Sequence, residues 1–117
     1  MSGSSSRNKG ANGERELAHI LHETFSLEEV RRGFVFCRES DLVGLKGIHV
    51  ECKRVEKLNI DKAIEQAIAE SEKRKDGKPT VFHRRNRKPW LVTMQLEDWI
   101  ELYRAWRGEE KNGSEGN

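Results

Sequence analysis

Cysteine is scarce in this chain, and long apolar segments are lacking. The two cysteines, Cys37 and Cys52, form no recognisable disulfide framework or zinc-binding pattern, so we expect reduced thiols in a cytosolic setting. No apolar run is long enough to span a membrane, and the N-terminus lacks the apolar segment of a secretory signal. These absences argue against membrane and secreted proteins and favour a cytoplasmic one.

Charged residues are abundant, although the two signs nearly cancel. They make up 36% of the 117 residues, hydrophobic residues make up 34%, and the formal net charge is +2. This composition is typical of one domain with a modest core and a strongly solvated surface. Two clusters of Lys and Arg stand out: Lys73, Arg74, Lys75 and Lys78, then Arg84, Arg85, Arg87 and Lys88. Such clusters suit a phosphate backbone, but on their own they fit a solvated surface equally well.

Periodicity predicts an α/β domain over residues 9–107, between polar tails at 1–8 and 108–117 that we expect to be disordered. The predicted order is a helix, three strands, a helix, two strands and a last helix, with a mixed sheet. The predicted helices span 10–23, 60–75 and 96–107, and the predicted strands span 30–36, 41–45, 48–54, 80–83 and 90–93. Asn59 is the expected N-cap of the second helix. The last helix carries an aromatic stripe that is expected to cover part of the sheet and to offer a dimer contact.

The stretch from Asp41 to Lys53 carries the candidate catalytic residues. Successive strand residues alternate faces, so His49, Glu51 and Lys53 share one face, with Glu51 and Lys53 about 7 Å apart. A three-residue turn that ends in Gly47 would place Asp41 directly opposite Glu51, with their Cβ atoms about 5 Å apart. Two carboxylates so close repel each other unless a cation lies between them, and a divalent cation meets that need. A slip of one residue would destroy this pairing.

Glu14 is a third unusual acid. It lies on the apolar face of the predicted first helix, together with Leu17, Ala18 and Leu21. A carboxylate is rarely buried unless it is paired or binds a metal. In the alternative interpretation, Glu14 is an acid near the helix N-terminus, where the helix dipole favours a negative charge. The hairpin acids are then ordinary charges on an exposed surface.

These motifs follow one another in the order of the PD-(D/E)XK nucleases. They are Asn8-Lys-Gly-Ala-Asn-Gly-Glu14, Ser40-Asp41-Leu-Val, His49-Val-Glu51-Cys-Lys53, and Gln66 on the next helix. Over residues 9–93 the chain resembles the archaeal-type Holliday junction resolvases and the short phage-encoded nucleases related to them. The second half looks like the phage branch. Ser40 stands where the name of the class has proline, a position that varies in this superfamily.

The resemblance implies a restriction-endonuclease-like fold, in which helices flank a mixed β-sheet, and phosphodiester hydrolysis with Mg²⁺ or Mn²⁺. The catalytic residues that it implies are Glu14, Asp41, Glu51, Lys53 and Gln66. The three acids would bind the metal together with the main-chain carbonyl of Cys52. Lys53 would orient or activate the attacking water.

The resemblance and the basic clusters together predict DNA as the substrate. The residues expected to contact its backbone are Arg84, Arg85, Arg87 and Lys88. We expect a Holliday junction resolvase, which implies branched DNA, a homodimer and the cytoplasm of a bacterium or of a phage-infected host cell. Two alternatives stay open: a nuclease of flap, nicking or restriction-like specificity, and an inactive DNA-binding module. His49 is a further candidate, because it shares the face of Glu51.

Overall fold

The fold is known from a computed structural model, which describes residues 2–25, 31–32, 42–43 and 45–109. Its elements are α1 (Ser2–Phe25), β1 (Arg31–Arg32), β2 (Leu42–Val43), β3 (Ile48–Arg54), α2 (Ile60–Arg74), β4 (Lys78–Arg84), β5 (Leu91–Met94) and α3 (Leu96–Trp106). This order confirms the predicted α/β arrangement. None of the described helices is long and apolar enough to cross a membrane.

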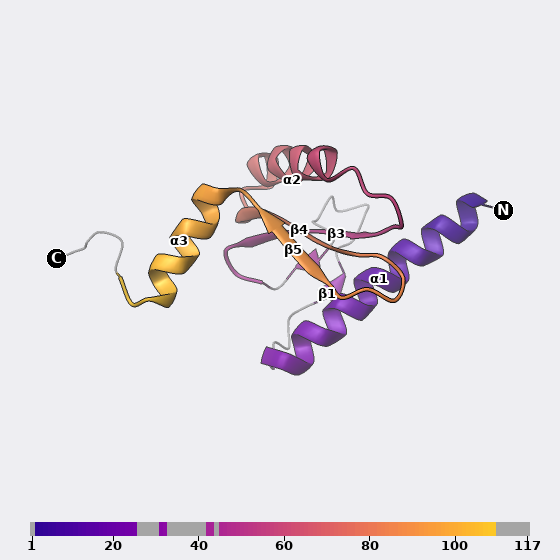
Figure 1. Cartoon of the computed structure of the whole chain (residues 1–117), viewed down its shortest axis with the longest axis horizontal. Coiled ribbons are helices and arrows are strands. Elements are labelled where there is room, and N and C mark those ends of the chain that lie inside the picture. The colour runs from indigo at the N-terminus through magenta and orange to yellow at the C-terminus, as the bar shows by residue number, and fades with distance from the viewer. Residues whose placement is uncertain (1, 26–30, 33–41, 44, 110–117) are drawn as a thin grey trace.

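The described strands form one mixed sheet in the order β1-β2-β3-β4-β5. β3 and β4 are parallel, whereas the other neighbouring strands are antiparallel. Two parallel neighbours need a crossover connection, and α2 supplies it. In Figure 1 the sheet lies between α2 above and α1 below. The structure thus confirms a mixed sheet flanked by helices, as the resemblance implied.

Alternation along β3 divides the core into two layers. Val50 and Cys52 are buried with Leu17 of α1 on one face of the sheet. On the other face, Val81 of β4 is buried with Ala63 and Ala67 of α2. The alternation along the predicted strand indicated that its side chains divide between two faces of the sheet, because neighbouring strand residues point in opposite directions. The small alanines of α2 let the helix lie close to the strand below it.

The turn before β3 sets the register that the sequence predicted. The Ile48 amide donates to the Leu45 carbonyl at 3.1 Å, and Gly47 has a φ of 85°, a conformation that favours glycine. Leu42 then pairs with Val50. This is the register from which Asp41 was placed opposite Glu51, but Asp41 itself lies outside the described residues, so its pairing stays a prediction.

A second turn lies against the first. Gly77 has a φ of 135°, and a Cβ atom on it would lie 2.3 Å from the Gly47 carbonyl carbon. The Lys78 amide donates to the Gly47 carbonyl at 2.9 Å. The loop after α2 is therefore held directly on the hairpin that leads into β3, with no room for a side chain between the two backbones.

We expect Gly77→Ala to lower the free energy of unfolding by about 2 kcal/mol or more, because it adds both backbone strain and a clash. Gly47→Ala is the matched control. A Cβ at Gly47 meets nothing within 4 Å, although its φ is also positive, so we expect a loss of about 1 kcal/mol from strain alone. Urea unfolding of both variants measures the difference, and equal losses would show that the close approach does not matter.

The helix ends are partly as predicted. The Asn59 side chain caps α2 by accepting from the Lys62 amide at 3.1 Å. α1 begins at Ser2, so residues 2–8, which were expected to form a disordered tail, lie within the helix. That segment contains no proline, and a helix extends at low cost once its first turns have formed. At the other end, residues 110–117 of the expected tail lie outside the described residues.

α3 differs from the expectation that its stripe covers the sheet. None of its residues is buried, and Figure 1 shows it extending away from the sheet. An ion pair between Lys78 and Glu101 connects it to β4. The aromatic rings of Trp99 and Tyr103 stack on each other at 5.2 Å, and both remain more than a third exposed. The sequence predicted the helix correctly and its contact with the sheet wrongly, whereas the dimer contact stays a prediction.

Candidate active site

Three of the predicted catalytic residues lie together on the face of the sheet that α2 covers. Glu51 and Lys53 both come from β3, and Glu51 pairs in register with Val81, whose side chain packs against α2. Gln66 projects from α2, and its Oε1 accepts a hydrogen bond from Lys53 Nζ at 3.1 Å. Glu51 is only 4% exposed. A buried carboxylate beside a lysine that a helix side chain holds in place is the centre of this site.

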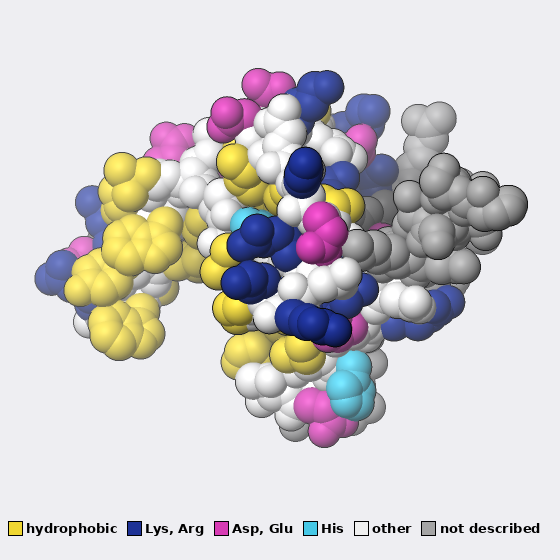
Figure 2. Space-filling model, turned by 45° about the vertical axis from the view of Figure 1, so that its right-hand side comes forward, with side chains coloured by type: hydrophobic (Ala, Val, Ile, Leu, Met, Phe, Trp, Pro, Cys, Tyr) yellow, Lys and Arg dark blue, Asp and Glu magenta, His cyan; other side chains and the backbone are white. Residues whose placement is uncertain are grey.

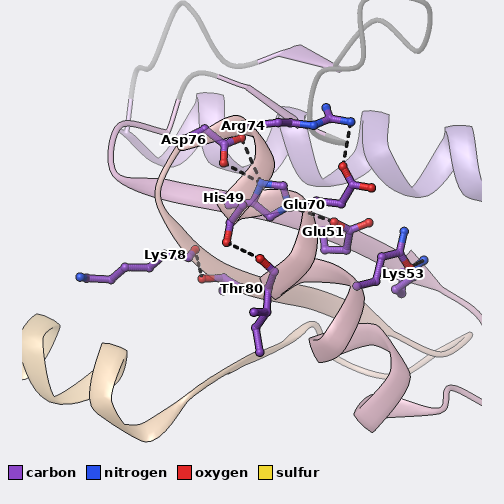
Figure 3. Close-up of polar contacts among 11 residues, drawn as sticks. His49, Glu51, Lys53, Glu70, Arg74, Asp76, Lys78 and Thr80 are labelled. Carbon is purple, nitrogen blue, oxygen red and sulfur yellow. Dashed lines mark hydrogen bonds and ion pairs between the residues drawn. The ribbon is translucent and has the colours of Figure 1, made fainter.

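His49 joins Glu51 to a residue that the sequence did not single out. Its Nε2 lies 3.0 Å from Glu51 Oε1, and its Nδ1 lies 2.8 Å from Asp76 Oδ1 (Figure 3). The imidazole is fully buried. His49 was a candidate because it shares the face of Glu51, and the structure confirms that the two side chains meet. Asp76 lies just after the predicted second helix, 27 residues beyond His49, and no role was predicted for it from the sequence.

The environment of His49 favours its charged form. Burial alone would lower its pKa, but the hydrogen bonds to Glu51 and Asp76, together with the charges of these acids, outweigh burial and raise the pKa above its usual value. An ionised carboxylate only accepts, so two such partners require both ring nitrogens to donate. The contacts therefore favour an imidazolium between the two acids.

The remaining predicted metal ligands are not brought together within the described residues. Glu14 lies half-buried on α1, whose neighbouring Leu17 packs against the face of the sheet opposite Glu51. The Cys52 side chain is buried on that same opposite face. In the part of the chain that the structure describes, no three His, Cys, Asp or Glu side chains form a group that could hold a metal.

The donor set nevertheless fits a divalent cation once Asp41 is counted. Glu51 offers a buried carboxylate whose second oxygen points away from His49 (Figure 3). The confirmed pairing of Leu42 with Val50 keeps the register that led to the prediction of Asp41 beside Glu51. Hard oxygen ligands of this kind are those that Mg²⁺ and Mn²⁺ prefer. The roles of Asp41, Glu14 and the Cys52 carbonyl stay predictions.

Comparison with known proteins identifies the family. A family model described as "phage putative PDDEXK endonuclease" matches residues 5–115. The chain belongs to this phage endonuclease family. No curated protein and no solved structure matches it. The match supports the PD-(D/E)XK resemblance, its phage branch and a nuclease activity, whereas the narrower resemblance to archaeal-type resolvases stays an expectation.

The predicted DNA-binding residues of the endonuclease divide into two kinds. The Arg84 guanidinium is held in place, because Nε and Nη2 donate to Glu16 at 3.0–3.2 Å and Nη1 donates to the carbonyls of Arg85 and Lys88. This arginine fastens the turn after β4 to α1. Arg85, Arg87 and Lys88 are exposed. Arg84 is partly buried, and a role of any of the four residues in DNA binding stays a prediction.

Two hollows border the exposed basic residues. A cavity of about 410 Å³ lies beyond the end of β3, lined among others by Lys57, His83, Arg85 and Lys88. A second one, of about 670 Å³, is lined by Arg54, Arg84, Asn86 and Arg87. Burial lowers the pKa of His83, which favours its neutral ring. Figure 2 shows Lys and Arg side chains gathered in the middle of the molecule and apolar side chains gathered over α3 at the left.

The contrast between the held Arg84 and the exposed Arg85 and Arg87 can be tested by DNA binding. We expect the double change Arg85→Ala and Arg87→Ala to weaken DNA binding while the free energy of unfolding stays unchanged. The slope of the log binding constant against log salt concentration should become shallower by about one for each arginine removed. Arg84→Ala should instead lower the free energy of unfolding by about 1 kcal/mol or more, because Glu16 loses its hydrogen bonds to Arg84 and, among the described residues, keeps only the ion pair with Arg54. Binding titrations at several salt concentrations and urea unfolding measure the two effects. A stable Arg84→Ala protein that binds DNA as poorly as the double variant would contradict this division.

Proposed function

We propose that the chain is a Mg²⁺- or Mn²⁺-dependent DNA endonuclease that resolves Holliday junctions. The observation that carries this proposal is the cluster of Glu51, Lys53 and Gln66 on the α2 face of the sheet, in a chain of the phage endonuclease family. An inactive binding module gains nothing from inward carboxylates, which repel phosphate. An intact acid-and-lysine pair therefore favours a catalyst over a binder.

Each residue has a chemical role in this proposal. The ligands assigned to the metal are Asp41, Glu51, Glu14 and the main-chain carbonyl of Cys52. When bound, the cation polarises a phosphoryl oxygen and lowers the pKa of an attacking water. Lys53 places a positive charge beside the nucleophile and the developing phosphorane charge. Gln66 takes up one of the three Nζ donors, which fixes the direction of the ammonium and leaves the others for water and phosphate.

The branched substrate and the homodimer belong together. A four-way junction needs two coordinated cuts, and a two-fold dimer supplies two sites with matching symmetry. α3 supports such a dimer because its apolar face is exposed: Leu96 is 70% and Trp106 80% accessible. The first turn of α3 carries Glu97 and Asp98 and its last turn carries Arg104. An antiparallel pair of α3 helices would place these opposite charges side by side.

One cleavage assay tests the function. Labelled four-way junction, flap and plain duplex of equal length are incubated with the protein in Mg²⁺ and, in parallel, in EDTA. We expect paired cuts in the junction that disappear in EDTA, and a dimer by light scattering at micromolar concentration. Equal cutting of flap or duplex would replace the resolvase assignment by another nuclease specificity. No cutting of any substrate would leave only the inactive DNA-binding module.

A further inference from the structure

We propose that His49 and Asp76 are positioning residues that hold the Glu51 carboxylate in the orientation in which it binds the metal. This inference rests on the proposed metal-dependent function. It assigns a role to a loop residue, Asp76, that lies outside the recognised motifs.

The chain of contacts runs inward from the surface. Asp76 keeps 32% of its side-chain surface exposed, whereas His49 has none and Glu51 has 5%. Both Asp76 oxygens lie close to His49 Nδ1, at 2.8 and 3.0 Å, so the ring cannot rotate without losing contacts. The opposite nitrogen then reaches Glu51 Oε1 at 3.0 Å. One carboxylate therefore orients the ring, and the ring orients the other carboxylate.

The Asp76 end of this chain is anchored by backbone. Asp76 directly precedes Gly77, whose approach to Gly47 holds the loop after α2 against the turn before β3. Lys78 adds a backbone hydrogen bond to the same turn. His49 lies only two residues beyond Gly47. The distance between Asp76 and His49 is consequently fixed by main-chain contacts rather than by the side chains alone.

The consequence for Glu51 is a restricted rotamer. A carboxylate that is buried and bonded through Oε1 presents its other oxygen in one direction, away from His49 (Figure 3). Partners behind a metal ligand commonly set its orientation, and removing them typically costs about 10- to 100-fold in metal affinity or activity. Without His49, Glu51 Oε1 would lose this hydrogen bond, and the carboxylate would be free to turn.

Calorimetry with Mn²⁺ alone, on protein freed of metal with EDTA, tests the inference. We expect His49→Leu to weaken Mn²⁺ binding by about 10- to 100-fold, and Asp76→Asn to weaken it several-fold. His49→Gln keeps an N–H that can donate to Glu51, so it should retain more affinity than His49→Leu. Glu72→Gln, which neutralises an exposed acid on α2, is the matched control and should bind as wild type does.

The outcomes separate this inference from the proposed function. The Mg²⁺ concentration that gives half-maximal cleavage should rise in parallel with the loss of Mn²⁺ affinity, which a purely structural role in folding would not produce. Folded Asp76→Asn and His49→Gln proteins with wild-type Mn²⁺ affinity would overturn the positioning role and leave the nuclease intact. If His49→Leu does not fold, these two variants decide the matter. Failure of the wild type to bind Mn²⁺ would instead remove the metal-dependent function itself.

Discussion

Lys53→Ala should reduce the rate of DNA cleavage by about 100- to 1000-fold, the range seen when one preorganised donor to a transition state is removed. The reason is local: Lys53 lies two residues from the buried Glu51, and Gln66 holds its Nζ at 3.1 Å. DNA affinity should stay within a few-fold of wild type, because one charge among many contributes little to backbone contact. Single-turnover cleavage and a binding titration of the same preparation measure the two quantities.

A neighbouring lysine provides the control for this result. Lys57 is exposed and lines the cavity beyond β3, so Lys57→Ala removes the same charge without touching Gln66. This variant should bind DNA slightly more weakly and cleave the bound DNA at the wild-type rate. The cleavage rate of Gln66→Leu should fall between those of Lys53→Ala and Lys57→Ala, because Lys53 keeps its charge but loses the hydrogen bond that fixes its direction. Normal cleavage by Lys53→Ala would show that the mechanism assigned to this residue is wrong.

Glu51→Gln should abolish detectable Mn²⁺ binding and cleavage together. The change keeps the shape of the side chain but removes the negative charge of the buried ligand, and hard cations prefer charged carboxylate oxygens. Asp41→Asn is expected to give the same loss, since Asp41 is the predicted cross-strand partner. Calorimetry on metal-free protein and the junction assay measure both losses.

Glu65→Gln is the matched control for the acid-to-amide changes. Glu65 precedes Gln66 on α2 and is exposed, so its loss removes one negative charge close to the site without removing a proposed ligand. We expect wild-type Mn²⁺ affinity and nearly wild-type cleavage. If Asp41→Asn binds Mn²⁺ as well as wild type while Glu51→Gln does not, Asp41 is not a ligand and the register argument fails at that position.

Local patterns in the sequence predicted the elements that surround the site. The bounds of β3 follow from alternation, and the turn before it follows from Gly47, which must adopt a positive φ. Asn59 marked the start of α2 because its short side chain can accept from the backbone two or three residues later. These features depend on neighbours in the chain, which is why a single sequence can reveal them.

Contacts between distant segments could not be predicted in the same way. Arg84 donates hydrogen bonds to Glu16, which lies 68 positions earlier in the chain, and is fixed by them. Arg85 is exposed, although the two arginines look equivalent in the sequence. Asp76 reaches His49 only because two glycine turns touch. The period of α3 predicted an apolar face, but periodicity carries no information about what that face meets.

The crossover from β3 through α2 to β4 has a consequence for how the endonuclease acquires its shape. His49, Glu51, Lys53, Gln66 and Asp76 all lie between residues 48 and 84, joined by short connections. The connections from β3 to α2 and from α2 to β4 are short, so closing them costs little conformational entropy. This segment is therefore expected to gather most of the site before α1 docks on the opposite face. Amide protection in pulsed hydrogen exchange should appear in β3 and α2 first and in α1 later.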